Sequence, residues 1–293
     1  MKRKITAFDL FIWIILIIAA FSCLAPVINA IAISFSDKAS AALGRVYFWP
    51  KNFNVSSYKK ILEEPQFFRS FANSLLRVTL GGAINIGFAV VMAYPLSQNK
   101  HVFRLRDVYM WLIVFTMLFS GGLVPSFIFI KNLQLMDTIW ALVLPGAAPV
   151  FSIILLMNFY KGIPRALEEA AIVDGANPLH ILVNVFIPLA KPAIATITLF
   201  AIVGHWNAFF DGKIYINTPA KIPLQTYIQS LTVQIDATKI AQMSREQILE
   251  QLERSNLTFN SAKIVVSMVP ILLIYPLLQR YFVTGIVMGA VKE

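Results

Sequence analysis

The chain has 293 residues, of which 58% are hydrophobic and 14% are charged, and its mean hydropathy is +0.70. A soluble domain is typically about 25% charged and could not bury this much apolar surface in one core. We therefore expect an integral membrane protein, and disordered, collagen-like and disulfide-rich classes are excluded. The net charge of +10 suits anionic lipid head groups, and no nucleic-acid motif accompanies it.

Six windows without charged residues run along the chain, and most approach the roughly 20 residues that cross a bilayer as a helix. None alternates with period two, as barrel strands would. We predict an all-α membrane protein with six transmembrane helices in a single transmembrane domain, residues 1–293. Gly121 and Gly122 predict close packing or a kink in the third span. The windows are Leu10–Ser36, Val78–Asn99, Val108–Ile130, Thr138–Tyr160, Pro192–Phe210 and Ile264–Gln279.

Basic residues near the span ends favour a cytoplasmic N-terminus, and six spans then return the C-terminus to the cytoplasm. The outer segment 37–69 and the outer loop 211–263 are basic as well, but long loops follow this rule weakly. Within the outer loop, Ser244–Arg254 is predicted to form a polar amphipathic helix. The residues that set the orientation are Lys2, Arg3, Lys4, Lys100, Arg104 and Arg106.

The inner loop 161–191 has strong helix signals. Pro164 suits a first turn, so a helix is expected over Arg165–Val173. Asp174-Gly175 ends it, because Gly175 is free to adopt positive φ, and Asn177-Pro178 begins a second short helix. Two short helices across the membrane face predict a docking site for a cytoplasmic partner, which would carry the partner's motion into the spans.

The same loop carries a motif. Glu169-Ala170-Ala171 is followed after three residues by Gly175 and after nine more by Val185-Phe186-Ile187-Pro188. This pattern resembles the coupling motif of binding-protein-dependent ABC importer permeases, which reads Glu-Ala-Ala, three residues, Gly, nine residues, Ile, any residue, Leu-Pro. Val185 and Ile187 replace its Ile and Leu with other apolar residues. The resemblance implies a type I ABC importer permease fold with cytoplasmic coupling helices.

More of the chain resembles the carbohydrate branch of that family, which includes the maltose permease G subunit and the lipoprotein-associated C-type sugar permeases. The resemblance includes an Asn-Ser pair before the second span, a Trp-Asn pair in the fifth span and the aromatic end of the chain. These residues are Asn73-Ser74-Leu75, Trp206-Asn207, Phe209-Phe210-Asp211, Ile214-Tyr215-Ile216, Tyr281-Phe282-Val283, Gly285 and Gly289-Ala290-Val291-Lys292.

The resemblance implies the roles of several residues. Glu169 would face an ATPase, Ala170 and Ala171 would pack in its groove, and Asp174 would cap the helix or contact the partner. Gly175 would permit the turn, and Pro188 would fix the join to the fifth span.

The resemblance also implies the assembly. The partners would be a second permease subunit, two ATPase subunits, an extracytoplasmic solute-binding protein and an oligosaccharide cargo, in a bacterial cytoplasmic (inner) membrane. This chain has no Gly-x-x-x-x-Gly-Lys-Ser/Thr loop, metal helix or nucleophile turn. It would be a non-catalytic subunit without a cofactor, and ATP and Mg²⁺ would bind to the partner ATPases.

Polar and aromatic groups within the spans are candidates for lining the substrate pathway, since polar groups in lipid face a bundle interior or water. Four of them supply the hydrogen bonds and the aromatic face that a sugar requires: Trp206, Asn207, Asp211 and Tyr215. Packing between helices is the alternative, and the stronger one. The other candidates are Asn29, Asn85, Asn158 and His205.

Other functions fit the sequence less well. An ion-coupled secondary transporter would usually carry acidic residues within its spans and internal repeats, and neither is found here. A membrane enzyme lacks its catalytic groups. The same ABC architecture could import a modified sugar or a cargo that is not a sugar. The basic outer residues suit an acidic oligosaccharide such as a uronate, although docking of an acidic binding protein is the preferred explanation.

Overall fold

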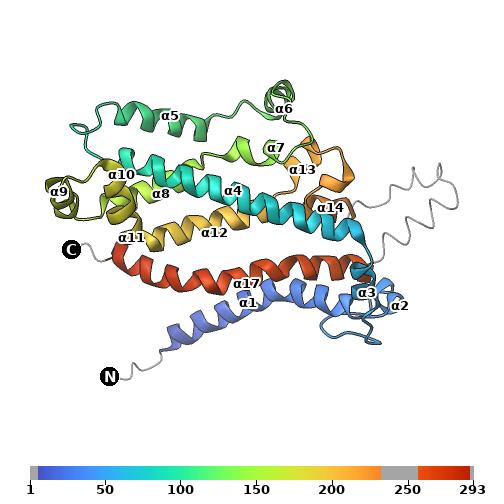
Figure 1. Ribbon diagram of the computed structural model, residues 1–293. Coiled ribbons are helices and arrows are strands. Elements are labelled where there is room, and N and C mark those ends of the chain that lie inside the picture. The colour runs from blue at the N-terminus through green and yellow to red at the C-terminus, as the bar shows by residue number, and fades with distance from the viewer. Residues whose placement is uncertain (1–5, 232–256, 291–293) are drawn as a thin grey trace. The chain divides into compact units, whose positions relative to one another are not determined.

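In the computed structural model, residues 6–231 and 257–290 are described, and their regular structure is helical throughout (Figure 1). The predicted all-α class is confirmed. The chain forms two compact units. The first comprises the described residues of Met1–Phe67 and Tyr227–Val269, and the second those of Phe68–Thr226 and Pro270–Glu293. The single domain over residues 1–293 stays a prediction.

Three helices are by themselves long and apolar enough to cross a membrane: α1 (Ala7–Ser34), α4 (Pro65–Ser97) and α17 (Leu257–Ala290). Three further candidate spans consist of two helical pieces that meet at a bend of 112°, 45° or 84°. The described residues thus contain three unbroken spans, and six if each bent pair crosses once, which is the predicted number.

Breaks in the sequence account for the bent spans. Gly122 has a φ of +85°, which an L side chain rarely adopts, and it lies in the gap between the two pieces of the third span. The kink predicted at Gly121-Gly122 is therefore confirmed. The fourth span bends near Pro145, and the fifth bends just before Pro192.

The first unit contains α1, the outer segment and the first half of α17. Thr6 and Asp9 form a capping box at the start of α1. The amide of Asn29 donates to the carbonyls of Val46 (3.1 Å) and Tyr47 (2.7 Å), which holds the outer segment beside α1. The short helices of this segment are α2 (Lys38–Ala42) and α3 (Ser56–Leu62).

A buried cation lies in the first unit. The Lys263 side chain is 1% exposed, and its Nζ pairs with Glu64 Oε2 at 2.6 Å and donates to the Tyr227 hydroxyl at 2.7 Å. The same Nζ lies 4.0 Å from the ring centroid of Phe259. These contacts connect α17 to the start of α4 and to the helix that contains Tyr227 within this unit, and they satisfy a charge that could not otherwise remain in an apolar span.

The second unit holds most of α4 and the helices between it and residue 226. Its core forms where α4 meets the helical segments 150–161, 178–189 and 191–207, with Ala89, Leu156, Phe186 and Ile197 buried. Small residues such as Ala93 and Ala190 let these helices approach closely. The helices not yet bounded are α5 (Arg106–Leu118), α6 (Leu123–Asn132), α7 (Trp140–Val143), η1 (Leu144–Gly146), α8 (Val150–Lys161), α9 (Arg165–Val173), α10 (Pro178–Ile181), the π-helix η2 (Leu182–Phe186), α11 (Ile187–Leu189), α12 (Lys191–Asn207), α13 (Phe210–Tyr215), η3 (Pro219–Lys221) and α14 (Leu224–Leu231).

The two ends of the second unit differ. The short helices α9, α10 and α11 gather at one end of the long helices, and α7 and α13 lie toward the other end (Figure 1). The inner loop 161–191 is therefore a separate structural feature at one end of this unit. The predicted helix Ser244–Arg254 and the basic residues Lys2, Arg3 and Lys4 lie outside the described residues.

Candidate functional site

The inner loop 161–191, here called the coupling loop, forms the helices that its sequence predicts. α9 spans Arg165–Val173 and ends at Asp174. Gly175 has a φ of +81°, its N–H donates to the Ile172 carbonyl at 2.9 Å, and the Ala176 N–H donates to the Ala171 carbonyl at 2.9 Å. This is the Schellman arrangement, which requires a residue that tolerates positive φ after the helix.

The second half of the loop is built into the core. The Asn177 side chain accepts from the His180 N–H at 2.8 Å and Pro178 fills the first turn, as predicted. Ile181, Leu182 and Phe186 are buried in the core cluster. The segment Pro178–Leu189 then meets α12 at 84°. Packed side chains therefore connect α10 to the fifth span.

An apolar surface covers the part of the coupling loop that faces away from the core. Val173 is 87% exposed, and four other large apolar side chains between residues 165 and 185 are exposed as well. Exposed apolar side chains grouped in this way are typical of a protein-binding surface. We call this set the loop patch: Leu167, Ile172, Val173, Leu179 and Val183.

Two charged residues fasten α9 to the end of α4. Glu168 Oε1 accepts from the Gln98 amide at 2.8 Å and from the Tyr94 hydroxyl at 3.1 Å. Arg165 Nη2 donates to Asn99 Oδ1 at 2.5 Å. The sequence analysis did not single out either residue, although Glu168 directly precedes the motif.

The predicted coupling residues differ in their exposure. Glu169, Ala170, Asp174 and Pro188 are exposed, so a partner could contact them. Ala171 is half-buried and packs against this chain's own core cluster. Ala170 is therefore better placed than Ala171 to pack in a partner's groove. The roles of all five residues stay predictions.

The second unit also contains a cavity of about 340 Å³, near the lower end of the range of ligand pockets, about 300–1,000 Å³. It lies where the break of the fourth span and the C-terminal half of α12 face α4. Its wall is largely apolar, with Phe200 and Ile197 among its residues. The polar side chains in its wall are Arg77, Asn85, Ser152, His205, Asp211 and Tyr215.

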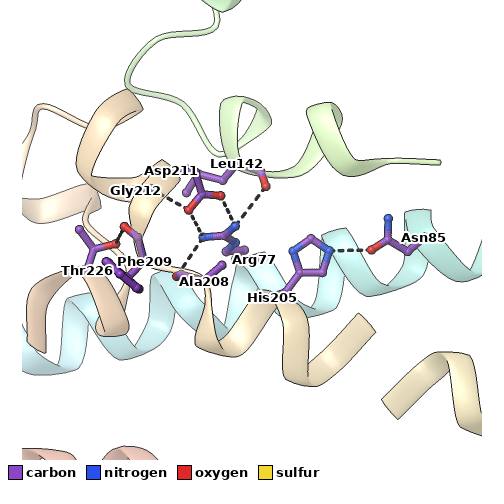
Figure 2. A network of polar contacts seen from close by, with 9 residues as sticks. All are labelled: Arg77, Asn85, Leu142, His205, Ala208, Phe209, Asp211, Gly212 and Thr226. Atoms are coloured by element: carbon purple, nitrogen blue, oxygen red, sulfur yellow. Dashed lines mark hydrogen bonds and ion pairs between the residues drawn. The ribbon is translucent and has the colours of Figure 1, made fainter. Parts of the chain in front are cut away.

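Arg77 is the centre of a polar network at this cavity (Figure 2). Its guanidinium forms a two-point ion pair with Asp211, although α4 provides one residue and α13 the other. It also donates to the carbonyls of Ala208 (3.3 Å) and Leu142 (3.4 Å). These carbonyls are near the ends of broken helices, so the cation binds backbone groups that an unbroken helix would satisfy.

A second part of the network joins Asn85 of α4 to His205 of α12 (Figure 2). The Asn85 amide donates to the carbonyls of Gly146 (2.6 Å) and Ala147 (3.1 Å), so its Oδ1 is left as an acceptor. His205 Nε2 lies 2.8 Å from this oxygen and must carry the proton. The His205 ring lies directly against Gly81, where a Cβ would approach it to 2.5 Å.

The four predicted pathway residues do not all line the cavity. Asp211 and Tyr215 do, and so does His205. Trp206 is buried and meets the Phe71 ring edge-on, with centroids 5.6 Å apart, so its place fits helix packing. Asn207 is exposed and is not part of the cavity wall.

The cavity wall also contains residues that the sequence analysis did not propose. The main one is Arg77, which immediately precedes a charge-free window. The helix α4 in fact begins twelve residues earlier, at Pro65, and the Arg77 side chain is 3% exposed.

Asp137 fixes the segment that follows α13. Its carboxylate accepts from the N–H groups of Asn217 (3.1 Å) and Thr218 (2.9 Å) and from Lys221 Nζ (2.8 Å). The hydrogen bond from Lys221, followed by those from Thr218, holds the pKa of Asp137 far below its usual value. The Asp137 N–H donates to the Tyr215 carbonyl at 2.8 Å, which places the end of α13 beside the cavity.

Apolar spans with broken helices, and a pair of short helices at one end of them, define a membrane permease subunit. Residues 85–288 match the family described as binding-protein-dependent transport system inner membrane component. The chain belongs to this family, and the family predicted from the coupling motif is confirmed. The family consists of inner-membrane permease components, which are not catalytic themselves.

Relatives with known names extend the match to the whole chain. Protein LplC of Bacillus subtilis (strain 168) is 38% identical over 267 residues, which are 91% of this chain and 88% of LplC. The polygalacturonan/rhamnogalacturonan transport system permease protein YtcP of the same organism is 35% identical over 292 residues, covering 100% of both chains.

A solved structure has the same fold. It is a chain from a crystal structure of a bacterial ABC transporter involved in the import of the acidic polysaccharide alginate. That chain is 34% identical to this one, with a TM-score of 0.84, and the match covers 96% of this chain and 100% of the other. The type I importer permease fold is confirmed.

Proposed function

We propose that this chain is one of two permease subunits of an ATP-driven importer for acidic oligosaccharides. One observation carries the cargo class. A permease named for polygalacturonan and rhamnogalacturonan transport matches the full length at 35% identity, and a chain of the alginate importer matches at 34%. All three named cargoes contain uronic acids, so their shared chemistry is a chain of sugars with carboxylates.

The charge of the outer segment supports an acidic cargo. Five cationic side chains of this segment are exposed within the first unit, and they would attract an anionic oligosaccharide or an acidic binding protein. The named relatives favour the oligosaccharide, whereas the sequence alone favoured the binding protein. The five residues are Lys38, Arg45, Lys51, Lys59 and Lys60.

The remaining parts of the importer are inferred from the family. A second permease forms the other wall of the pathway, two ATPase subunits bind ATP and Mg²⁺, and an extracytoplasmic binding protein delivers the cargo. The coupling loop faces the cytoplasm in this assembly, and both termini lie on the same side. The loop patch supports this arrangement, because five exposed apolar side chains would otherwise remain in water.

The coupling loop transmits the motion of the ATPases. Glu169 and Asp174 are exposed beside the loop patch and meet an ATPase subunit, with Ala170 as the close contact. Gly175 holds the turn between the two helices, and Pro188 stands before the bend into the fifth span. The buried side chains of α10 and η2 make the loop a stiff lever, since packed side chains transmit displacement.

The coupling role is tested in the reconstituted complex with its cognate partners. ATP hydrolysis is measured with the cargo-loaded binding protein for the wild type and for Glu169→Lys and Gly175→Pro. Both variants should lose the stimulation while the complex stays assembled. Glu63→Lys, at an exposed carboxylate of the outer segment, is the matched control and should keep it. Normal coupling in both loop variants would contradict this role.

The cargo class needs a separate comparison. The purified binding protein is loaded with oligogalacturonate, alginate oligomers or maltooligosaccharides of equal length, and stimulated ATP hydrolysis is measured with each. The acidic oligomers should stimulate and the neutral ones should not. Stimulation by the neutral oligomers alone would overturn the acidic cargo and leave the coupling role intact.

A further inference from the structure

A second cavity lies where the coupling loop joins the spans. It has a volume of about 350 Å³ and is bounded by the end of α4, the start of α5, the end of α8 and the start of α9. We call it the root pocket. Its polar wall includes Gln98, Arg106, Tyr160, Lys161, Arg165 and Glu168.

Three donors in the root pocket lack full hydrogen bonding. The Tyr160 side chain is 2% exposed, and its hydroxyl has no partner among the described residues. Lys161 Nζ makes no hydrogen bond or ion pair within the described part of the chain. Arg165 uses one nitrogen, on Asn99, and its other N–H groups are available. A buried hydroxyl without a partner is costly, and this one is part of a cavity wall.

Charge in the root pocket favours an anion. Arg106 and Lys161 repel each other, and Arg165 adds a third positive charge to the wall. Two carboxylates are present as well. Glu168 already accepts hydrogen bonds from Tyr94 and Gln98, and Glu169 is exposed.

Asp107, just outside the wall, provides a further negative charge. Its carboxylate pairs with Lys100 at 2.5 Å and lies 3.9 Å from Arg106. The cations that face the cavity are therefore compensated only in part.

The helix α9 adds to this preference. It has nine residues, and no side chain caps its first N–H groups. Its first turn forms part of the pocket wall through Arg165 and Glu168. The positive end of an uncapped helix attracts an anion, and the unpaired hydroxyl of Tyr160 lies in the same wall.

We infer that the root pocket binds the phosphate of an anionic phospholipid from the cytoplasmic leaflet. The pocket lies at the ends of three candidate spans, where lipid head groups reach the protein. Basic pockets between spans on the cytoplasmic side are suited to such head groups. The phosphate accepts from Lys161, Arg165 and Tyr160, and the acyl chains extend along the spans.

Binding there joins α9 to the end of α8, because one phosphate contacts Arg165 of the loop and Tyr160 and Lys161 of the span. The lipid therefore stiffens the base of the coupling loop. The cytoplasmic side of this pocket rests on the topology in the proposed function. Lipid binding itself does not depend on the cargo, so the two proposals fail in different experiments.

The test measures lipid retained by the assembled complex. The complex is placed in nanodiscs of phosphatidylglycerol and phosphatidylcholine, extracted in mild detergent and analysed by native mass spectrometry over a series of lipid ratios. Removal of two cations in Lys161→Gln/Arg165→Gln should weaken phosphatidylglycerol binding about thirtyfold. Tyr160→Phe should weaken this binding less. Lys161→Arg keeps the positive charge and should bind phosphatidylglycerol as the wild type does.

The matched control is Arg104→Gln, because Arg104 is exposed in the neighbouring inner loop and does not line the pocket. It should retain phosphatidylglycerol as the wild type does. Equal loss in this control, or no loss in the double variant, would overturn the site. Full displacement by inorganic phosphate would show that the pocket takes a soluble anion. Variants that do not assemble are replaced by Tyr160→Phe, which removes only the hydroxyl.

Discussion

Arg77 and Asp211 are 134 residues apart in the chain, yet their side chains form a two-point ion pair at the wall of the membrane cavity. The arginine side chain is almost fully buried, and the Asp211 side chain is 29% exposed. Because the guanidinium also binds the Leu142 and Ala208 carbonyls, this single cation joins α4 to two broken spans.

Removal of Asp211 alone should therefore lower the stability of the protein more than removal of both residues. In Asp211→Leu, Arg77 keeps a buried charge without a counterion, which costs about 3 kcal/mol. The double variant Arg77→Leu/Asp211→Leu should recover part of this loss. Thermal unfolding of the purified complex measures both, and the double-mutant cycle gives the coupling energy.

The control for the arginine is Arg69→Leu, on the same helix but exposed. It should leave the melting temperature nearly unchanged, since an exposed charge contributes little. Equal melting temperatures for Asp211→Leu and Arg69→Leu would show that the pair is not important for stability.

Two neighbouring glycines of α4 provide a matched pair. A Cβ at Gly81 would lie 2.5 Å from the His205 ring, whereas nothing lies within 4 Å of a Cβ at Gly82. Gly81→Ala should thus destabilise the protein by about 1–3 kcal/mol through overpacking. Gly82→Ala should be neutral or stabilising by up to about 1 kcal/mol, because alanine favours a helix.

A second substitution, at His205, identifies the cause of the destabilisation by Gly81→Ala. If the His205 ring is what the new methyl group meets, Gly81→Ala/His205→Ala should be more stable than the sum of the single changes predicts. Chemical denaturation of the complex in detergent measures this difference, and strict additivity would contradict the contact.

Substitutions of the two adjacent glutamates of α9 should affect different properties of the protein. Glu168→Ala leaves Tyr94 and Gln98 without their acceptor and should cost about 1–3 kcal/mol. Faster hydrogen exchange in α9 would report this loss. Glu169→Ala should leave stability and exchange unchanged, because Glu169 is exposed. It should reduce stimulated ATP hydrolysis, because Glu169 meets an ATPase subunit in the proposed function.

The Asp137 carboxylate should make the stability of the protein depend on pH. Its pKa lies below the ordinary 3.8 in the folded protein, mainly because of the hydrogen bond from Lys221. The ionised form is favoured by folding, so its stabilisation is complete above about pH 4 and is lost as the pH falls through the lowered pKa. Asp137→Asn should be less stable than the wild type at pH 7, and the difference should shrink below pH 4.

Lys221→Met is the companion variant, since it removes the largest contribution to that low pKa. Melting temperatures of all three proteins from pH 7 to pH 3 measure the effect. A constant difference between wild type and Asp137→Asn over this range would show that the Asp137 carboxylate is not stabilised by its partners.

The sequence by itself determined the features that depend on neighbouring residues. Long apolar runs identified the spans, because a helix in lipid must be predominantly apolar over about 20 residues. The bounds of α9 followed from Pro164 and Asp174-Gly175, because a helix begins and ends through contacts within one turn. The break at Gly121-Gly122 and the family motif are local in the same sense.

Only the tertiary structure decided the contacts between distant segments. Arg77 lies just outside a charge-free window, but α4 extends beyond that window, and Asp211 is the partner of the arginine. Trp206 resembled a sugar contact but packs on Phe71. Glu168 turns inward while Glu169 stays exposed. Neither periodicity nor charge specifies which helices meet, since that depends on how side chains pack in three dimensions.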